Sequence, residues 1–114
     1  MELISLHGMR MNVISSAKGG VVSSETVFEF EQKQAVVSAR YRGGQIIDGY
    51  LIGRIEGGIL DFRYVQTDDQ GNLDSGRSWA EFDRSEDGRL RLVEHFQWAT
   101  RPGGGTNIFE EISG

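Results

Sequence analysis

Short glycine-containing clusters divide the chain into segments of about 8 to 12 residues, the spacing of strands in an antiparallel meander. The segments are rich in Val, Ile, Phe, Tyr and Thr, which favour strands. Glycine supplies the positive φ angles that tight hairpins require. A helix needs apolar residues at intervals of 3 and 4 over about 11 residues, and glycines interrupt most windows of that length. The pattern predicts a ribbon of hairpins, with turns at residues 18–20, 42–44, 56–58, 69–72, 86–89 and 101–105.

A ribbon of this kind has two unpaired edges, and closing it on itself removes both. We therefore predict an all-β fold, an antiparallel up-and-down barrel of about eight strands, with an open two-layer sandwich as the alternative. One β-barrel domain is expected to fill residues 1–114. A further short strand could form at residues 2–6. The main strands are expected near residues 9–15, 21–31, 35–42, 45–55, 59–67, 72–82, 89–99 and 106–112.

Charge and composition narrow the classes of function. The formal net charge is −5 at pH 7, whereas a protein that holds nucleic acid by its phosphates needs a basic surface. There are no cysteines, which excludes disulfides, a thiolate nucleophile and cysteine-ligated metals. No apolar run approaches the roughly 20 residues that span a bilayer, and no secretory signal pattern is present. We expect a cytoplasmic protein without nucleic-acid or membrane partners.

One glutamate interrupts an apolar stripe in the segment "RLRLVEHFQWA" (89–99). Every second residue gives Leu90, Leu92, Glu94, Phe96 and Trp98, and alternate residues of a strand share a face. Glu94 is therefore predicted to point inside the barrel. A carboxylate cannot stay alone there, because desolvating an isolated charge costs several kcal/mol. Glu94 needs a partner.

The turns suggest which residue that partner is. Phe62 and Tyr64 belong to the better inner face of segment 59–67. If residues 69–72 form a two-residue hairpin, Tyr64 lies opposite Arg77 and Phe62 lies opposite Trp79. The longer turn at 83–88 would then place Arg77 opposite Glu94. The sequence thus predicts a group of polar and aromatic residues that can bind a ligand, comprising Tyr64, Arg77, Trp79, Glu94 and Trp98.

This group allows three functions. In a ligand-binding barrel, Arg77 and Glu94 hold a small polar or aromatic ligand between aromatic walls. In a structural or protein-interaction module, they satisfy each other in a filled core or face solvent. In an enzyme, Glu94 and Glu110 would both face inward on adjacent strands and do acid–base work. We favour ligand binding without catalysis, since the chain has no nucleophile elbow.

Neither a metal nor a cofactor is expected. The chain has two histidines, His7 and His95, and no spacing brings the three ligands that a metal site needs together. His95 alternates onto the face opposite Glu94 and should meet water. The "DDQGNLD" segment (68–74) is predicted to be a hairpin turn and not a calcium loop, because the sixth-position glycine is absent. A homodimer is also allowed.

Four stretches, "RYRGGQIIDGYLIG", "LDFRYVQTDDQGNL", "GRLRLVEHFQWAT" and "IFEEI", resemble a family of small bacterial proteins that is commonly labelled N-acetylglutamate synthase. The resemblance covers roughly residues 9 to 112. It implies an antiparallel barrel similar in shape to avidin and lipocalins (calycin-like). The chain lacks the Arg/Gln-x-x-Gly-x-Gly/Ala sequence at a helix start that cradles acetyl-CoA, so the resemblance carries the fold and no catalytic residue.

Overall fold

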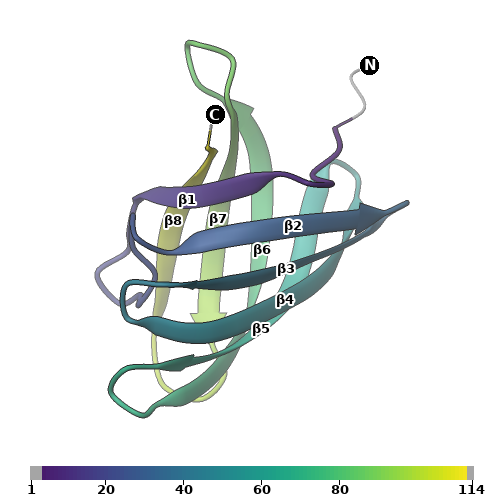
Figure 1. Ribbon diagram of the computed structural model, residues 1–114. Helices are drawn as coiled ribbons and strands as arrows, with labels where there is room; N and C mark the ends of the chain where they lie inside the picture. The colour runs from purple at the N-terminus through teal and green to yellow at the C-terminus, as the bar shows by residue number, and fades with distance from the viewer. Residues whose placement is uncertain (1–3, 113–114) are drawn as a thin grey trace.

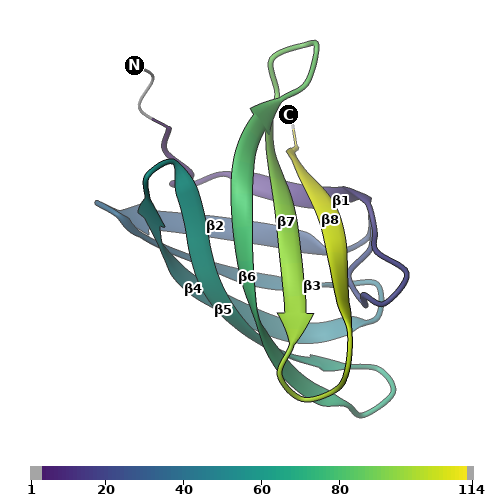
Figure 2. The ribbon, with the colours of Figure 1, turned by 180° about the vertical axis from the view of Figure 1, so that it is seen from behind.

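The computed structural model describes residues 4–112, and in them the chain forms eight strands and no helix. Each strand pairs antiparallel with the next, and β8 pairs with β1, which closes the barrel (Figures 1 and 2). The predicted up-and-down barrel is confirmed, and the open sandwich is wrong. The strands are β1 (Arg10–Ser15), β2 (Val27–Lys33), β3 (Val36–Gly43), β4 (Ile46–Glu56), β5 (Ile59–Asp68), β6 (Leu73–Arg84), β7 (Leu90–Trp98) and β8 (Gly104–Glu111).

The predicted strand bounds hold within two residues everywhere except at the start of β2. Residues 21–26 were expected in that strand and instead belong to the β1–β2 loop. Ser23 and Thr26 explain the difference, because their side chains bond the loop's own backbone. The Ser23 amide donates to Thr26 Oγ1 at 3.0 Å, and Thr26 Oγ1 donates to Gly43 O. Residues 4–6 form no strand, and residues 2 and 3 of the expected extra strand lie outside the described residues.

Aromatic rings fill much of the barrel interior. Phe28 stacks on Tyr41 and on Phe109, with ring centroids 4.4 Å apart in both pairs. Met11 and Val13 of β1 are buried beside Phe109 at the seam where β1 meets β8. Burying each side chain of this size contributes about 1.5–3 kcal/mol relative to leaving it exposed. The seam is therefore part of the core.

Two tyrosines of the interior each lie opposite a glycine. Tyr41 pairs with Gly49 across β3 and β4, and Tyr64 pairs with Gly76 across β5 and β6. A Cβ at Gly49 would overlap the Tyr41 ring, and one at Gly76 would overlap the Tyr64 hydroxyl. The missing Cβ atoms let each ring lie against the neighbouring strand. These pairs fix where the two hydroxyl groups point.

The β5–β6 turn is one residue longer than predicted. Its loop comprises residues 69–71, since the Asp68 amide donates to Asn72 O at 3.1 Å. Gly71 has φ of 82°, the left-handed conformation that closes a three-residue hairpin. As a result Tyr64 pairs with Gly76 and not with Arg77. A slip of one residue turns a strand over.

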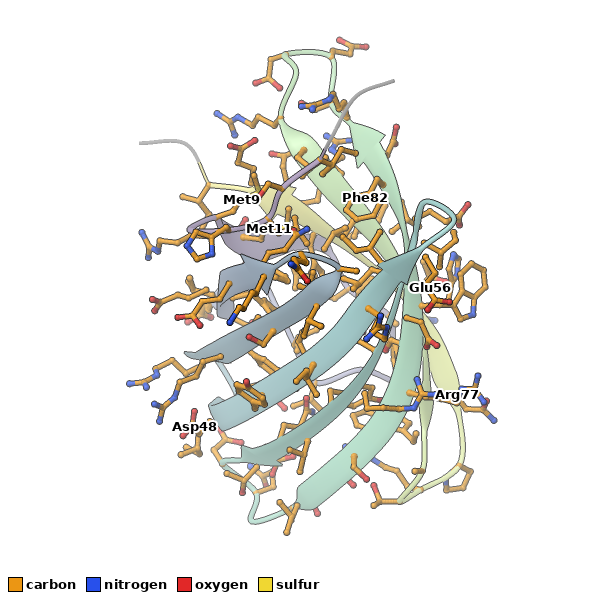
Figure 3. All side chains as sticks on the ribbon, turned by 90° about the vertical axis from the view of Figure 1, so that its right-hand side faces the viewer. Met9, Met11, Asp48, Glu56, Arg77 and Phe82 are labelled. Carbon is orange, nitrogen blue, oxygen red and sulfur yellow. The ribbon has the colours of Figure 1, made fainter. Side chains whose placement is uncertain are left out.

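The inward positions predicted for Arg77 and Trp79 are therefore wrong, since both side chains lie on the outer face of β6. Figure 3 shows the Arg77 side chain outside the barrel. The next turn is also longer than predicted, and Ala80 rather than Arg77 pairs with Glu94. The register between β6 and β7 is also shifted by an odd number of residues. The two odd shifts cancel, so β7 keeps its predicted inner face and Glu94 stays inside.

β8 also presents the face opposite to the one predicted. Asn107 and Phe109 are buried, whereas Glu110 was expected inside. Glu94 pairs directly with Asn107 across β7 and β8. Glu110 lies on the outer face, where its carboxylate is 2.7 Å from Arg91 Nε. The pair of inward carboxylates expected for an enzyme, Glu94 with Glu110, is therefore not formed.

Candidate functional site

Glu94 is buried in the barrel and holds its two carboxyl oxygens against two neutral donors. Ser78 Oγ donates to Oε2 at 2.7 Å, and Asn107 Nδ2 donates to Oε1 at 2.9 Å. The residue is 5% exposed. Both donors come from strands that flank β7, since Ser78 lies on β6 and Asn107 on β8. Three adjacent strands thus build the polar centre, and no arginine takes part in it.

Burial raises the pKa of Glu94 above its ordinary range, because an apolar interior disfavours the charged carboxylate. The hydrogen bonds from Asn107 and Ser78 act in the opposite direction, since both donors stabilise the charged form. Two opposing effects therefore act on Glu94. Burial favours the protonated acid, and the donated hydrogen bonds favour the carboxylate. A group that brings positive charge or further donors next to it would favour the carboxylate.

Two tyrosine hydroxyls share the interior with Glu94, and they differ in their partners. Tyr41 Oη donates to Gln66 Oε1 at 2.8 Å. Within residues 4–112, the buried Tyr64 hydroxyl has no hydrogen-bond partner. Burial raises the pKa of both tyrosines, and the nearby Glu94 raises it further. An unpartnered buried hydroxyl costs about 1–3 kcal/mol, so Tyr64 is a polar atom that a bound molecule could satisfy.

A small cavity lies between these groups, with a volume of about 20 Å³. On this scale a single water needs about 10–15 Å³, so the closed cavity has room for about one water. Its polar lining comprises Tyr41, Tyr64, Gln66, Glu94 and Asn107. Its apolar lining is mostly aromatic and comprises Phe28, Phe62, Phe96, Trp98 and Phe109, with Leu51, Gly20, Val21 and Val22.

The β1–β2 loop, residues 16–26, lies at one end of the barrel, beside the ends of β1 and β2 (Figure 1). Gly20, Val21 and Val22 line the cavity from the loop side. Two hydrogen bonds tie the loop to the barrel strands near its start. The Ala17 amide donates to Asn107 Oδ1 at 2.8 Å, and Trp98 Nε1 donates to Gly19 O at 3.0 Å. For the loop to move, these two bonds and the packing of Ala17, Val21 and Val22 against the core would have to break.

A second polar group surrounds Trp98 at the same end. The Arg101 guanidinium lies 4.3 Å from the centroid of the Trp98 ring, a cation–π contact. Arg101 also pairs with Asp74 at 2.8 Å, and Thr100 Oγ1 donates to the same carboxylate at 2.7 Å. The arginine of this end is thus engaged by Asp74 at the rim.

The structure brings Tyr64, Glu94 and Trp98 of the predicted site together, since all three line the cavity. It does not bring Arg77 and Trp79 there. Trp79 is 46% exposed on the outer face, where its ring stacks on His95 at 4.1 Å. His95 is on that outer face, as expected. The sequence did not identify three polar residues of the site, namely Ser78, Asn107 and Gln66. The alternation of Asp74, Gly76, Ser78 and Ala80 could have indicated the inner face of β6, but Trp79 is the more apolar signal.

The described part of the chain offers neither of two other kinds of site. In residues 4–112, no three His, Asp or Glu side chains gather in a way that could hold a metal ion. No helix in this range is long and apolar enough to cross a membrane.

Comparison with known proteins adds a family to this geometry. The family model of avidin-like proteins matches residues 4–112. No curated protein and no solved structure gives a significant match. The family model spans nearly the whole chain, so the chain belongs to the avidin-like family. The avidin-like part of the resemblance found in the sequence is confirmed.

Proposed function

We propose that this member of the avidin-like family binds a small molecule inside the barrel, beside Glu94 and beneath the β1–β2 loop. The observation that carries the proposal is the position of Glu94. It is a buried carboxyl group on a cavity wall, and its partners among the described residues are two neutral donors. A buried ionisable group with a perturbed pKa, in a cavity with convergent polar atoms, is a candidate for a binding site.

The free hydroxyl of Tyr64 supports the same site. It lies in the cavity lining without a partner in the described chain, and a core built only for stability would leave such a group partnered. A ligand atom that bonds Tyr64 would remove that cost. The aromatic walls supply the apolar contact area that small-molecule sites commonly have.

The closed cavity is too small for any ligand much larger than water. Binding therefore requires the loop to move outward. The loop is suited to this, because its segment "KGG" (18–20) contains two glycines and its cavity-lining residues are only partly buried. Its far end is anchored by Thr26, which is fully buried. Residues 17–22 would then swing while Thr26 stays in place.

Thermal-shift screening against a metabolite library tests the proposal. A ligand at 100 times its Kd adds about 2.7 kcal/mol of stability. A hit that binds inside should lose its effect in Glu94→Gln and keep it in the matched outer-face variant Arg77→Ala. A library in which no compound stabilises the protein, or in which the hits depend on Arg77 and not on Glu94, would contradict the proposal.

A protein-interaction role is a second candidate, and the outer face of β4–β6 favours it. Tyr50, Val65 and Leu73 are exposed there and line one shallow groove, and the nearly filled interior fits such a role. We propose a second copy of the chain as the partner, in line with the homodimer that the sequence allows. Sedimentation over a concentration series tests this, since the variant Leu73→Lys should abolish a dimer that the groove forms.

Four further predictions rest on the sequence alone. The N-acetylglutamate synthase label and a bacterial source come from the resemblance, and the cytoplasmic location comes from the composition. A lipocalin-like relationship is likewise a prediction from the resemblance. For an acetyltransferase activity, incubation with acetyl-CoA and glutamate is the direct assay, and we expect no product because an acetyl-CoA cradle is missing from the sequence.

A further inference from the structure

We propose that the ligand of this site carries a small cationic group with N–H donors, such as an ammonium or amidinium, and that the group binds between Glu94 and the aromatic walls. This inference rests on the proposed function and narrows it to a class of ligand. It follows from three features of the cavity, namely its missing positive charge, its donors and its rings.

The first feature is the missing counter-charge. In the described chain, none of the residues that line the cavity is Lys, Arg or His. The arginine at this end, Arg101, pairs with Asp74 through Nη2 and lies over the Trp98 ring, while its buried Nε has no hydrogen-bond partner among the described residues. His95 follows Glu94 directly but projects from the outer face, toward Glu81 and Thr106. His95 therefore acts on Glu94 only from the outer face, and no cationic side chain of the described residues lines the cavity beside it. A positive charge inside the cavity can come from a ligand.

The second feature is the arrangement of hydrogen bonds around Glu94. Each carboxyl oxygen accepts one bond, from Ser78 Oγ and from Asn107 Nδ2. A carboxylate oxygen has two lone pairs, so each oxygen keeps one acceptor position. A ligand with N–H donors can use these positions, and hydrogen bonds between ionised partners are roughly twice as strong as neutral ones.

The third feature is the aromatic wall. Tyr64, Phe96 and Trp98 form a cluster at the cavity, with edge-on contacts at 5.7 Å and 5.5 Å between ring centroids. Phe28 and Phe109 stack at its other side. Ring faces attract cations through their quadrupole, most strongly where water is excluded. A carboxylate among aromatic rings is suited to an organic cation, while a ligand carboxylate would meet repulsion from Glu94.

Two isosteric pairs of probes test the ligand class on the intact wild-type protein. Benzamidinium is compared with benzamide, and acetamidinium with acetamide, by isothermal titration or by chemical shifts at pH 8. Each pair has nearly the same shape and differs in charge. We expect each amidinium to bind at least about tenfold more tightly than its amide, since hydrogen bonds between ionised partners are roughly twice as strong as neutral ones.

Variants locate the effect. Glu94→Gln keeps the size of the side chain and should lower amidinium affinity at least about tenfold while leaving amide affinity nearly unchanged. Glu81→Gln, which removes a carboxylate from the outer face, is the matched control and should change neither affinity. The comparison of the probes on the wild-type protein stands even if Glu94→Gln fails to fold.

The outcomes separate the ligand class from the proposed function. Amides that bind as tightly as amidiniums, or probes of which none binds, overturn the cationic ligand. Amidinium affinity that persists in Glu94→Gln and falls in Glu81→Gln also overturns it. A neutral or anionic library compound that binds beside Glu94 would overturn the ligand class and keep the proposed function.

Discussion

Asn107 donates to Glu94 with its amide nitrogen at 2.9 Å, and its amide oxygen accepts the backbone N–H of Ala17 at 2.8 Å. One side chain therefore touches both the buried acid and the loop that covers it. Any ligand that competes for Glu94 also meets the group that holds the loop closed. This link gives the predictions below a common physical basis.

The loop should open more often in Asn107→Ala. This change leaves Ala17 N–H and one oxygen of Glu94 without their partner, and each buried group left unsatisfied costs about 1–3 kcal/mol. We expect faster hydrogen exchange at the Ala17 amide and a clear loss of stability on chemical unfolding. Asn12→Ala, which removes a more exposed bond to Ser24 O at the same loop, should alter both much less. Unchanged exchange at Ala17 would show that Asn107 does not hold the loop.

Stability should depend on pH through Glu94. Its pKa is raised by burial, so the folded state binds a proton more tightly than the unfolded state does. Below the unfolded pKa of about 4.3 both states are protonated. As pH rises from there to the folded pKa, the wild type loses up to about 1.4 kcal/mol per unit relative to Glu94→Gln; above it the difference is constant.

His95 on the outer face opposes the raised pKa of Glu94 when it is charged, and the groups that face Glu94 inside the barrel add no titration in this range. Tyr41 and Tyr64 titrate even above their ordinary range, because burial raises the pKa of both, and Ser78 and Asn107 do not titrate. Urea unfolding of wild type and Glu94→Gln at several pH values gives the difference. A wild type that gains stability relative to Glu94→Gln as pH rises would contradict a raised pKa. Glu31→Gln, at an exposed position of β2, should show no such difference.

Removing the hydroxyl of Tyr41 and removing that of Tyr64 should change the stability of the protein differently. Tyr41→Phe breaks the bond to Gln66 and should destabilise the protein by about 1 kcal/mol. Tyr64→Phe removes a hydroxyl that has no partner among the described residues, so it should be neutral or stabilising by up to about 1 kcal/mol. Thermal unfolding of the two variants side by side measures the contrast. Equal losses would mean that Tyr64 has a partner in solution.

The glycine opposite Tyr64 should be sensitive to a single methyl group. In Gly76→Ala the new Cβ would overlap the Tyr64 hydroxyl and the Gln97 carbonyl oxygen, and such overpacking typically costs about 1–3 kcal/mol. The neighbouring Arg77→Ala, on the exposed face, should stay within about 0.5 kcal/mol of wild type. Chemical unfolding gives both values. A Gly76→Ala variant as stable as Arg77→Ala would contradict the packing of Tyr64 against β6.

The hairpin ribbon could be predicted because glycine turns and alternating residues are local signals. Glu94 could be placed inside from β7 alone, since four apolar residues share its face. The hydrogen-bond partners of Glu94 could not be predicted, because they depend on whether each of two turns shifts the strand register by an odd or an even number of residues. Gly71 made the first turn one residue longer, which exchanged Arg77 for Ser78 on the inner face of β6. A second odd slip then restored the face of β7.

The cover of the cavity was beyond the sequence for a different reason. Val21 and Val22 look like the start of a strand, and only the bonds of Ser23 and Thr26 to the local backbone keep them in the loop. These bonds depend on where the chain passes Gly43, which is distant in sequence. The inward position predicted for Trp79 was wrong for a similar reason. Its ring contacts His95 of the neighbouring strand on the outer face, and that contact is not visible in the local sequence.

Fluorine NMR of protein labelled with 5-fluorotryptophan tests binding inside the barrel most directly. The chain has two tryptophans, Trp98 in the cavity wall and Trp79 on the outer face. Titration with benzamidinium and with each thermal-shift hit should move the Trp98 resonance and leave that of Trp79 in place. A ligand that moves Trp79 alone, or a library in which no compound moves Trp98, would contradict the interior site.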